Sequence, residues 1–268
     1  MSKIVVVTGA GSGIGRATAL AFAKQGARVA VCDVDEARLQ TLTAELGDRA
    51  LLARKVDVSS RAEMSAFADA VHALAPAADV IVNNAGVAIG GTFLETSLDD
   101  WDWLLGINLK GVVHGCHFFI PKMVARGEGG HVVNISSILG IYPAPNVTAY
   151  VASKFAVRGL SQSLRAELEP HKIGVTAICP GMINTSIVAD GRMNSHIASR
   201  KSKMVATFAQ RGAPPELVAR EILDAVRTNP AVRPVGRDAK VIAAFTRMAP
   251  QITTRLGTLL SKRFGAAG

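Results

Sequence analysis

Residues 4–15 read Ile-Val-Val-Val-Thr-Gly-Ala-Gly-Ser-Gly-Ile-Gly, and this stretch decides the fold class. The apolar run predicts a short buried strand, and the pattern from Ile14 onward predicts a helix. Glycines between the two allow a sharp turn and a close approach of a ligand to the backbone. A helix that begins there points its free N–H groups at anionic groups. A glycine string alone is a weak signal, but this position predicts a cradle for a dinucleotide pyrophosphate.

The same order, a short apolar run and then a helical pattern, repeats as far as Pro180. Expected strands span 4–8, 29–32, 50–56, 79–83, 131–136 and 175–179, and expected helices span 14–25, 35–46, 60–74, 101–125 and 150–167. This alternation predicts an α/β fold with a Rossmann-type, doubly wound parallel sheet. We expect residues 1–268 to form a single domain with a helical C-terminal extension.

The cysteines and the apolar segments bound the class of protein. Cys32, Cys116 and Cys179 are unclustered, so we expect buried reduced thiols and neither a disulfide framework nor a metal site. The N-terminus has no secretory signal pattern, and no run of 18 apolar residues predicts a membrane span. A cytoplasmic location is the default expectation.

Positive charge is concentrated in the C-terminal part. The chain has 30 Lys and Arg against 21 Asp and Glu. Of these, 14 basic residues and 4 acidic residues lie in residues 192–268. A solvated surface is the favoured interpretation, and a site for an anionic substrate or a lipid surface is the next. Nucleic-acid binding is not expected, because no basic and aromatic residues interleave.

The chain beyond Pro180 departs from the alternating pattern. A helix is expected over 216–227 and a short strand over 232–235. Residues 238–264 predict a helical tail with apolar residues near one face, interrupted at Pro250. Two interpretations of this tail stay open: an element of oligomerisation or lid packing, and a basic amphipathic segment that contacts an anionic lipid surface.

Asp33 ends the second expected strand, 18 residues after Gly15. A carboxylate at that place can accept hydrogen bonds from the adenosine ribose and would repel a 2′-phosphate. Arg38 lies about a helical turn too far along to offset the repulsion. The sequence therefore predicts NAD(H) in preference to NADP(H), with a helix N-cap as the alternative role of Asp33.

Other strand ends carry further candidates for the cofactor. Asp57 follows the third strand and could bond an adenine amino group, and Ala85 and Gly86 leave room beside the fourth strand. Each of these alone is more typical of a turn. Residues 180–185, Pro-Gly-Met-Ile-Asn-Thr, follow the sixth strand and could seat a nicotinamide carboxamide.

Tyr150 and Lys154 lie four residues apart on an expected helix, so their side chains share one face. An ammonium near a phenol favours the phenolate and should lower its pKa. Ser137 stands 13 residues before Tyr150 at a strand end, where its hydroxyl could hold a carbonyl oxygen. Asn108 lies inside an expected helix, which is an unfavourable place for an amide without a role.

Taken together, these motifs resemble the short-chain dehydrogenase/reductase family over about residues 1–185. The matching motifs are Thr-Gly-x3-Gly-x-Gly at 8–15, Asn-Asn-Ala-Gly at 83–86, Asn108, Ser137, Tyr150-x3-Lys154 and Pro180-Gly181. The resemblance implies a catalytic tetrad of Asn108, Ser137, Tyr150 and Lys154. Tyr150 would exchange the proton, Ser137 would polarise the carbonyl, Lys154 would bind the nicotinamide ribose, and Asn108 would hold a water of a proton relay.

The expected cofactor site follows from the same motifs. Its residues are Gly9, Ser12, Gly13, Ile14, Gly15, Asp33, Asp57, Val58, Asn84, Ala85, Gly86, Tyr150, Lys154, Pro180, Ile183 and Thr185. In this family the segment after Pro-Gly folds over the substrate, so residues 186–210 are an expected lid. Its apolar residues could line a pocket, and Arg192, Arg200, Lys201 and Lys203 could meet an anionic group or remain solvated.

The expected function is an NAD(H)-dependent oxidoreductase that interconverts a secondary alcohol and a ketone, with an apolar or lipophilic substrate. The family implies a homodimer or homotetramer. One alternative is a non-catalytic dinucleotide sensor or scaffold on the same fold, which would need a broken tetrad. Another is a family member with epimerase or lyase chemistry. A hydride-transfer assay separates these alternatives.

Overall fold

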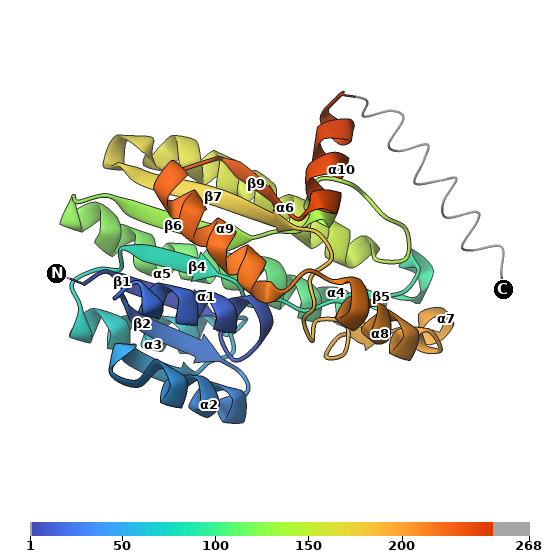
Figure 1. Ribbon diagram of the computed structural model, residues 1–268, viewed down its shortest axis with the longest axis horizontal. Helices are drawn as coiled ribbons and strands as arrows, with labels where there is room; N and C mark the ends of the chain where they lie inside the picture. Colours follow the sequence, from blue (N-terminus) through green and yellow to red (C-terminus); the bar gives the residue numbers. More distant parts are fainter. Residues whose placement is uncertain (1, 249–268) are drawn as a thin grey trace.

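The computed structural model describes residues 2–248 (Figure 1). Its main sheet has the strand order β3-β2-β1-β4-β6-β7-β9, and every neighbouring pair is parallel. The strands are β1 (Ile4–Thr8), β2 (Arg28–Asp33), β3 (Ala50–Lys55), β4 (Val80–Asn83), β6 (Gly130–Ile135), β7 (Ile173–Pro180) and β9 (Val232–Val235). The predicted doubly wound parallel sheet is confirmed.

Helices cover both faces of this sheet (Figure 1). One face carries α1 (Gly13–Lys24), α2 (Glu36–Leu46) and α9 (Pro215–Thr228), and the other carries α3 (Arg61–Leu74), α5 (Gly111–Arg126) and α6 (Thr148–Leu168). Strand β1 shows why its sequence is apolar throughout. Val5 and Val7 pack into one core and Val6 into the other, because side chains alternate across a strand.

The sheet order reverses between β1 and β4. From β1 the chain winds outward through β2 to β3, and β4 then pairs with the other edge of β1. The carboxyl ends of these strands leave a crevice at such a switch point, where ligands bind in open α/β sheets. The glycine loop and the Asn-Asn-Ala-Gly segment both begin at this point.

The single helix expected between the fourth and fifth strands is divided into three elements in the structure. Residues 101–125 were expected to be continuous, and the structure has α4 (Leu98–Leu105), a π-helical turn (Gly106–Lys110) and α5. Asn108 therefore lies in the π turn rather than in a regular α-helix. Such turns occur often at functional sites, and nothing in the local sequence pattern predicts one.

The segment after β7 has more order than its sequence predicts. β8 (Arg192–Met193) pairs with β5 (Ile89–Gly90) as a second, two-stranded sheet, and α7 (Ser195–Ala198) and α8 (Lys201–Arg211) follow. Helix α10 (Arg237–Met248) forms the described part of the expected 238–264 tail. The rest of that tail, with Pro250, lies outside the described residues. No helix within residues 2–248 is long and apolar enough to cross a membrane.

A buried histidine at the amino end of β6 makes stability depend on pH. His131 Nε2 lies 3.0 Å from Thr176 Oγ1, which donates its own proton to the Pro230 carbonyl, so the imidazole must be the donor. Burial, with a smaller effect of Arg165, lowers the pKa of His131 to about 4. The unfolded chain therefore binds more protons than the folded chain between pH 6.5 and 4.

We predict that the free energy of unfolding falls by about 3 kcal/mol as pH drops through this window. His131→Gln removes the titrating ring and should flatten this part of the stability curve, measured by urea unfolding at several pH values. The matched control is His117→Gln on the exposed face of α5, which should keep the wild-type slope. An unchanged slope in His131→Gln would contradict the assignment.

Candidate active site

The glycine loop is locked to the Asn-Asn-Ala-Gly segment. Gly9 has φ +62° and passes so close to Ala85 that a Cβ atom on Gly9 would lie 2.6 Å from the Ala85 Cα. The Thr8 hydroxyl accepts hydrogen bonds from the Asn84 and Ala85 amides at 3.0 and 3.1 Å. Asn84 Nδ2 donates to the carbonyls of Thr8 and Gly9 at 3.0 and 2.9 Å. Two predicted cofactor residues, Asn84 and Ala85, thus hold the loop in shape.

The loop leaves the first turn of α1 open to an anion. Ser12 is the N-cap of α1, and its side chain makes no capping hydrogen bond to the helix. Gly13, with φ +52°, and Ile14 begin the helix, so their amides are among the N–H groups without an intrahelical partner. These amides are available to the pyrophosphate that the sequence predicts here, and that contact stays a prediction.

Gly15 is the position in this loop with the least room. A Cβ there would lie 2.1 Å from the Gly9 carbonyl oxygen and 2.4 Å from Asn84 Nδ2. We predict that Gly15→Ala pushes the loop off the helix and weakens NADH binding at least about tenfold, as for a loss of about 1.4 kcal/mol, in a fluorescence titration.

The control for Gly15→Ala is Gly159→Ala on α6, where a Cβ meets nothing within 4 Å. That substitution should leave NADH binding unchanged and raise the free energy of unfolding by roughly 0.5–1 kcal/mol, since glycine is unfavourable inside a helix. Equal NADH affinities of Gly15→Ala and the wild type would count against the cradle.

Asp33 is fixed beside the glycine loop, where the sequence predicts the adenosine ribose. Its Oδ2 accepts a hydrogen bond from the Gly11 amide at 2.7 Å, and its Oδ1 accepts one from the Asp35 amide at 2.9 Å. The N-cap of α2 is Asp35, whose side chain accepts from the Arg38 amide, so the helix-cap alternative for Asp33 is wrong. Each carboxylate oxygen of Asp33 keeps a lone pair for a ribose hydroxyl.

Arg38 requires a correction. The sequence spacing suggests that it is too far along α2 to matter at Asp33. A Cβ on Gly11 would nevertheless lie 2.9 Å from both the Arg38 Cβ and the Asp33 carboxyl carbon. The first turn of α2 folds back over the glycine loop, so Arg38 stands beside Asp33.

Asp57 and Val58 have partners within the protein. Asp57 Oδ1 accepts hydrogen bonds from the amide and hydroxyl of Ser59 at 2.9 and 2.7 Å, which is the geometry of a turn. The Val58 side chain is buried against Gly111 of α5. The cofactor contacts of both residues stay predictions.

Tyr150 and Lys154 lie on one face of α6. The Lys154 Nζ is 5.5 Å from the centre of the Tyr150 ring and donates a hydrogen bond of 3.0 Å to the Ile135 carbonyl at the end of β6. Burial raises the pKa of Tyr150 to about 12, and a hydrogen bond with Ser137 opposes this rise. Burial lowers the pKa of Lys154 to about 8. Among the protein's own groups, the rise in the Tyr150 pKa that burial causes is therefore larger than the lowering expected from Lys154.

The two neighbouring serines have different partners. The Ser136 hydroxyl donates to the Lys154 carbonyl at 2.8 Å and packs under Gly140, which is a structural position. The Ser137 hydroxyl lies with Tyr150 and also accepts from the Leu139 amide at 3.1 Å. This geometry favours Ser137 over Ser136 for a contact with substrate.

Asn108 is fully buried and links the π turn to the site. Its Oδ1 accepts from the Val87 amide at 2.8 Å, and its Nδ2 donates to the Val87 carbonyl and to Ser153 Oγ at 3.0 and 3.2 Å. Ser153 in turn donates to the Tyr150 carbonyl at 2.7 Å. A Cβ on Gly86 would lie 3.3 Å from Asn108 Oδ1 and 3.4 Å from Lys154 Nζ, so these groups converge.

Sequence reasoning passed over Ser153. It is a fully buried hydroxyl three residues after Tyr150, and it joins Asn108 to the helix that carries Tyr150 and Lys154. The sequence pattern does not single it out, because the buried side of α6 also carries the polar residues Lys154 and Ser161.

The segment after β7 faces the glycine loop from the other side. The Thr185 side chain lies 3.0 Å from the position of a Cβ on Gly13. Pro180 ends β7, and Ile183 is buried in the core beneath the segment. The Met182 amide donates to Asp238 Oδ2 of α10 at 2.9 Å, a contact that sequence reasoning did not anticipate.

Two of the four basic residues for which the sequence leaves an anionic group or solvent as alternatives bind within the protein instead. Arg192 forms an ion pair with Asp100 at 2.8 Å and lies 3.9 Å from the centre of the Trp103 ring. Lys201 donates to the Gly191 carbonyl at 2.9 Å. Arg192 therefore binds the lid to α4, and Lys201 binds one part of the lid to another. These contacts correct the idea that the two residues bind an anionic group.

An apolar cluster adjoins Tyr150 under this lid. Its buried members are Ile89, Leu104 and Ala149, and Val87, Trp101, Trp103, Leu105 and Tyr150 pack against them. Met193 of β8 lies against Gly90, and a Cβ atom added to Gly90 would lie 2.5 Å from the Met193 side chain. The phenol of Tyr150 thus borders apolar side chains on one side and Ser137 on the other.

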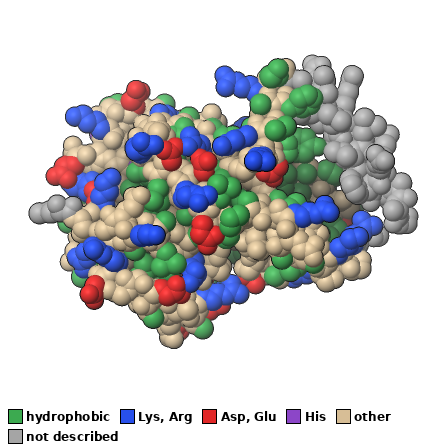
Figure 2. All heavy atoms as spheres, in the orientation of Figure 1, with side chains coloured by type: hydrophobic (Ala, Val, Ile, Leu, Met, Phe, Trp, Pro, Cys, Tyr) green, Lys and Arg blue, Asp and Glu red, His purple; other side chains and the backbone are tan. Residues whose placement is uncertain are grey.

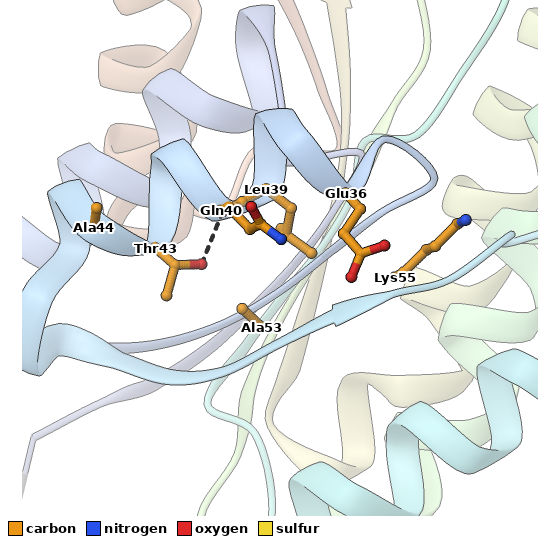
Figure 3. Close-up of a pocket in the computed structure, with 7 residues that line it drawn as sticks. All are labelled: Glu36, Leu39, Gln40, Thr43, Ala44, Ala53 and Lys55. Atoms are coloured by element: carbon orange, nitrogen blue, oxygen red, sulfur yellow. Dashed lines mark hydrogen bonds between the residues drawn. The ribbon is translucent and has the colours of Figure 1, made fainter.

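A separate hollow of about 380 Å³ lies between α2 and β3 (Figure 3). Glu36, Leu39, Gln40, Thr43, Ala44, Ala53 and Lys55 line it, and the dashed line in Figure 3 is the bond of 2.8 Å from the Thr43 hydroxyl to the Leu39 carbonyl. No predicted site residue lies there. Within residues 2–248 no group of three or more metal-ligating side chains gathers, and the three cysteines are buried and free.

Curated proteins with similar sequences are named as oxidoreductases. EphD of Mycobacterium tuberculosis H37Rv is 42% identical over 256 residues, which cover 92% of this chain and 43% of EphD. The chain therefore spans less than half of that relative. SadH of the same organism is 36% identical over 256 residues, which cover 92% of this chain and 90% of SadH.

The fold and a family profile agree with these relatives. A short chain dehydrogenase/reductase from Burkholderia phymatum in complex with NAD superposes with a TM-score of 0.86 at 28% identity, and the match covers 94% of this chain and 95% of that one. The short chain dehydrogenase profile matches residues 3–195. The chain therefore belongs to the short-chain dehydrogenase/reductase family of oxidoreductases.

Proposed function

We propose that this protein is an NAD(H)-dependent oxidoreductase that interconverts a secondary alcohol and a ketone. The convergence of Tyr150, Lys154 and Ser137 beside an apolar cluster carries this proposal. A nicotinamide dinucleotide would supply or accept the hydride, and the glycine cradle fits its pyrophosphate because the Gly13 and Ile14 amides at the start of α1 have no intrahelical partner.

The protein's own groups manage the proton. In reduction, the Tyr150 hydroxyl gives its proton to the carbonyl oxygen as the hydride reaches the carbonyl carbon, and the product is an alcohol. Ser137 donates a hydrogen bond to the same oxygen and favours the negative charge that develops on it. In oxidation, the phenolate of Tyr150 takes the hydroxyl proton.

Lys154 and Asn108 support this proton transfer. The Lys154 amine lies near enough to the Tyr150 ring to favour its phenolate once charge develops there. Asn108 clamps the Val87 backbone and, through Ser153, the Tyr150 carbonyl, which holds α6 at a fixed distance from the β4 segment. We propose that the tetrad predicted from the sequence works in this arrangement.

The pKa of about 12 for Tyr150 sets the direction of the pH dependence. Below that pKa the phenolate fraction rises about tenfold per pH unit. We therefore predict that initial rates of alcohol oxidation rise with pH from about pH 7 to about pH 8, up to the pKa at which Lys154 loses its charge, while ketone reduction gains nothing from added base. Initial rates of alcohol oxidation and of ketone reduction, measured across this pH range, check this. An oxidation rate that falls over the range would contradict the role of Tyr150 as base.

The substrate class follows from the cluster beside Tyr150. Ile89 and Leu104 are buried, and the partly buried Trp101 and Trp103 of α4 pack against them together with Tyr150, so the surroundings of the phenol are apolar, while Ser137 would serve the substrate oxygen. We propose an apolar or lipophilic alcohol or ketone. A panel of such compounds that varies in chain length, followed at the nicotinamide absorbance with NADH and NADPH, is the test.

Turnover of apolar ketones with NADH supports the proposal. Tight NADH binding without turnover of any ketone or alcohol would favour the alternative of a dinucleotide sensor or scaffold. A product with unchanged redox state would favour epimerase or lyase chemistry. A strong preference for NADPH would overturn the choice of NAD(H) that rests on Asp33.

The exposed side of α10 supports an association with another surface (Figure 2). Val241, Phe245 and Met248 are 68%, 42% and 84% exposed and recur at helical spacing, with Lys240 and Arg247 exposed beside them. We propose self-association into a homodimer or homotetramer, with contact to an anionic lipid surface as the second candidate.

Two measurements separate these candidates for α10. Sedimentation velocity of the wild type and of Phe245→Ser tests self-association, and co-sedimentation with vesicles of phosphatidylglycerol tests lipid contact. A smaller assembly in the variant supports the oligomer, and loss of vesicle binding supports the lipid surface. The cytoplasmic location also stays a prediction.

A further inference from the structure

Arg38 and Asp190 form an ion pair between segments that are 152 residues apart in the chain. Arg38 lies in the first turn of α2, and Asp190 follows Thr185 in the segment that faces the glycine loop. Arg38 Nη1 donates to Asp190 Oδ2 at 2.9 Å. The Ser186 hydroxyl donates to the same oxygen at 2.6 Å, and the Asp190 amide donates to the Ser186 carbonyl at 2.7 Å.

The pair lies at the adenosine end of the cradle. Arg38 Cβ and the Asp33 carboxyl group both lie against Gly11, and Asp33 is the residue proposed to receive the ribose hydroxyls. A phosphate on the ribose 2′ oxygen would therefore arrive beside Arg38. A guanidinium at such a place is the usual means of accommodating that phosphate.

Carboxylates already surround this guanidinium. Asp190 binds Nη1, and Asp35 lies 3.1 Å from Nε. Asp35 also accepts a hydrogen bond from the Arg38 amide as the N-cap of α2, so it belongs to the helix start. Asp190 comes from the other side of the crevice and binds Nη1, whereas Asp35 lies at Nε.

We propose that Asp190 is a specificity residue for the cofactor, because it occupies Arg38 and so withholds the guanidinium from a ribose 2′-phosphate. Discrimination against NADP(H) then has two parts: Asp33 repels the phosphate, and Asp190 denies it a cation. This inference rests on the proposed function for the position of the dinucleotide. The hydrogen bond with Arg38 also lowers the pKa of Asp190, which keeps its carboxylate charged at neutral pH.

The decisive variant is Asp190→Asn, which removes the charge and keeps the shape and an acceptor for Ser186. The readout is a ratio of affinities for two probes, 2′,5′-ADP over 5′-ADP, measured by calorimetry on the whole protein. We expect this ratio to rise roughly fivefold, as for a partly exposed charge pair. The ratio of kcat/KM for NADPH over NADH should rise in the same direction.

Two controls locate the effect. Glu128→Gln removes one exposed carboxylate beside the amino end of β6. The proposed cofactor crevice lies at the carboxyl ends of the strands, so this substitution should leave the probe ratio unchanged. In an Arg38→Ala background, Asp190→Asn should change the ratio less than twofold, because the guanidinium that Asp190 withholds is gone.

The outcomes separate this inference from the proposed function. If 5′-ADP does not bind the wild type, the dinucleotide cradle itself fails. If 5′-ADP binds and Asp190→Asn leaves the ratio unchanged, the cradle stands and the role of Asp190 is overturned. A rise of equal size with and without Arg38 also overturns it, since Asp190 would then act by its own charge.

Discussion

Tyr150→Phe should lower kcat by roughly 10²–10⁴-fold, the range that a positioned proton donor contributes. The ring stays in place against Ile89 and Leu104, because phenylalanine fills the same apolar space. Only the hydroxyl that meets Ser137 is lost. NADH binding should remain close to that of the wild type, so the change falls on kcat rather than on cofactor affinity. Turnover of an accepted ketone, together with a fluorescence titration of NADH, measures both.

The chain offers a matched control for this substitution. It has two tyrosines, and Tyr142 lies just after the turn that follows Ser137. Tyr142→Phe removes the same atom from the same residue type and should keep turnover within about threefold, the scale of a surface change of about 0.5 kcal/mol. Wild-type turnover in Tyr150→Phe would refute the central assignment.

Lys154→Met is expected to have the second largest effect. Methionine matches the length of the side chain but cannot donate to the Ile135 carbonyl or place a positive charge near the Tyr150 ring. We expect kcat/KM to fall by about 10²-fold or more, which corresponds to about 2.7 kcal/mol of lost transition-state stabilisation. Steady-state rates with varied NADH and ketone show how the loss divides between cofactor binding and turnover.

Lys24→Met on the exposed end of α1 controls for loss of one lysine. It should leave kcat/KM unchanged. Because burial lowers the pKa of Lys154 to about 8, the amine loses its charge as pH rises through that value. A variant without Lys154 should lose whatever pH dependence the wild type shows there. A Lys154→Met enzyme with the wild-type rate and pH profile would contradict the role of this residue.

The sequence predicted those parts of the fold that depend on local pattern. β1, the glycine turn and α1 follow one another within 21 residues, so their order is written in adjacent positions. The short strand at residues 232–235 is also confirmed as β9, because the turn residues on both sides of it, Pro230 and Gly236, are themselves a local signal.

The parts that sequence reasoning missed depend on contacts between distant segments. The ion pair of Arg38 with Asp190 joins positions 152 residues apart, and no spacing rule connects them. The pKa values of Tyr150 and Lys154 are set by burial, which is known only when the lid and α4 are in place. The π turn around Asn108 keeps the hydrogen bonding of a helix, so a periodic pattern does not distinguish it.

That π turn has a consequence for how the protein can change. It adds one residue to the repeat between α4 and α5, and one residue corresponds to about 100° of rotation. The apolar sides of the two helices therefore point in different directions: Leu104 of α4 packs in the cluster beside Tyr150, while Val112 and Phe119 of α5 pack against the sheet. Residues on the side of α4 that faces Tyr150 can therefore change without altering how α5 packs on the sheet, and Asn108 in the turn between them stays bonded to Val87 and Ser153.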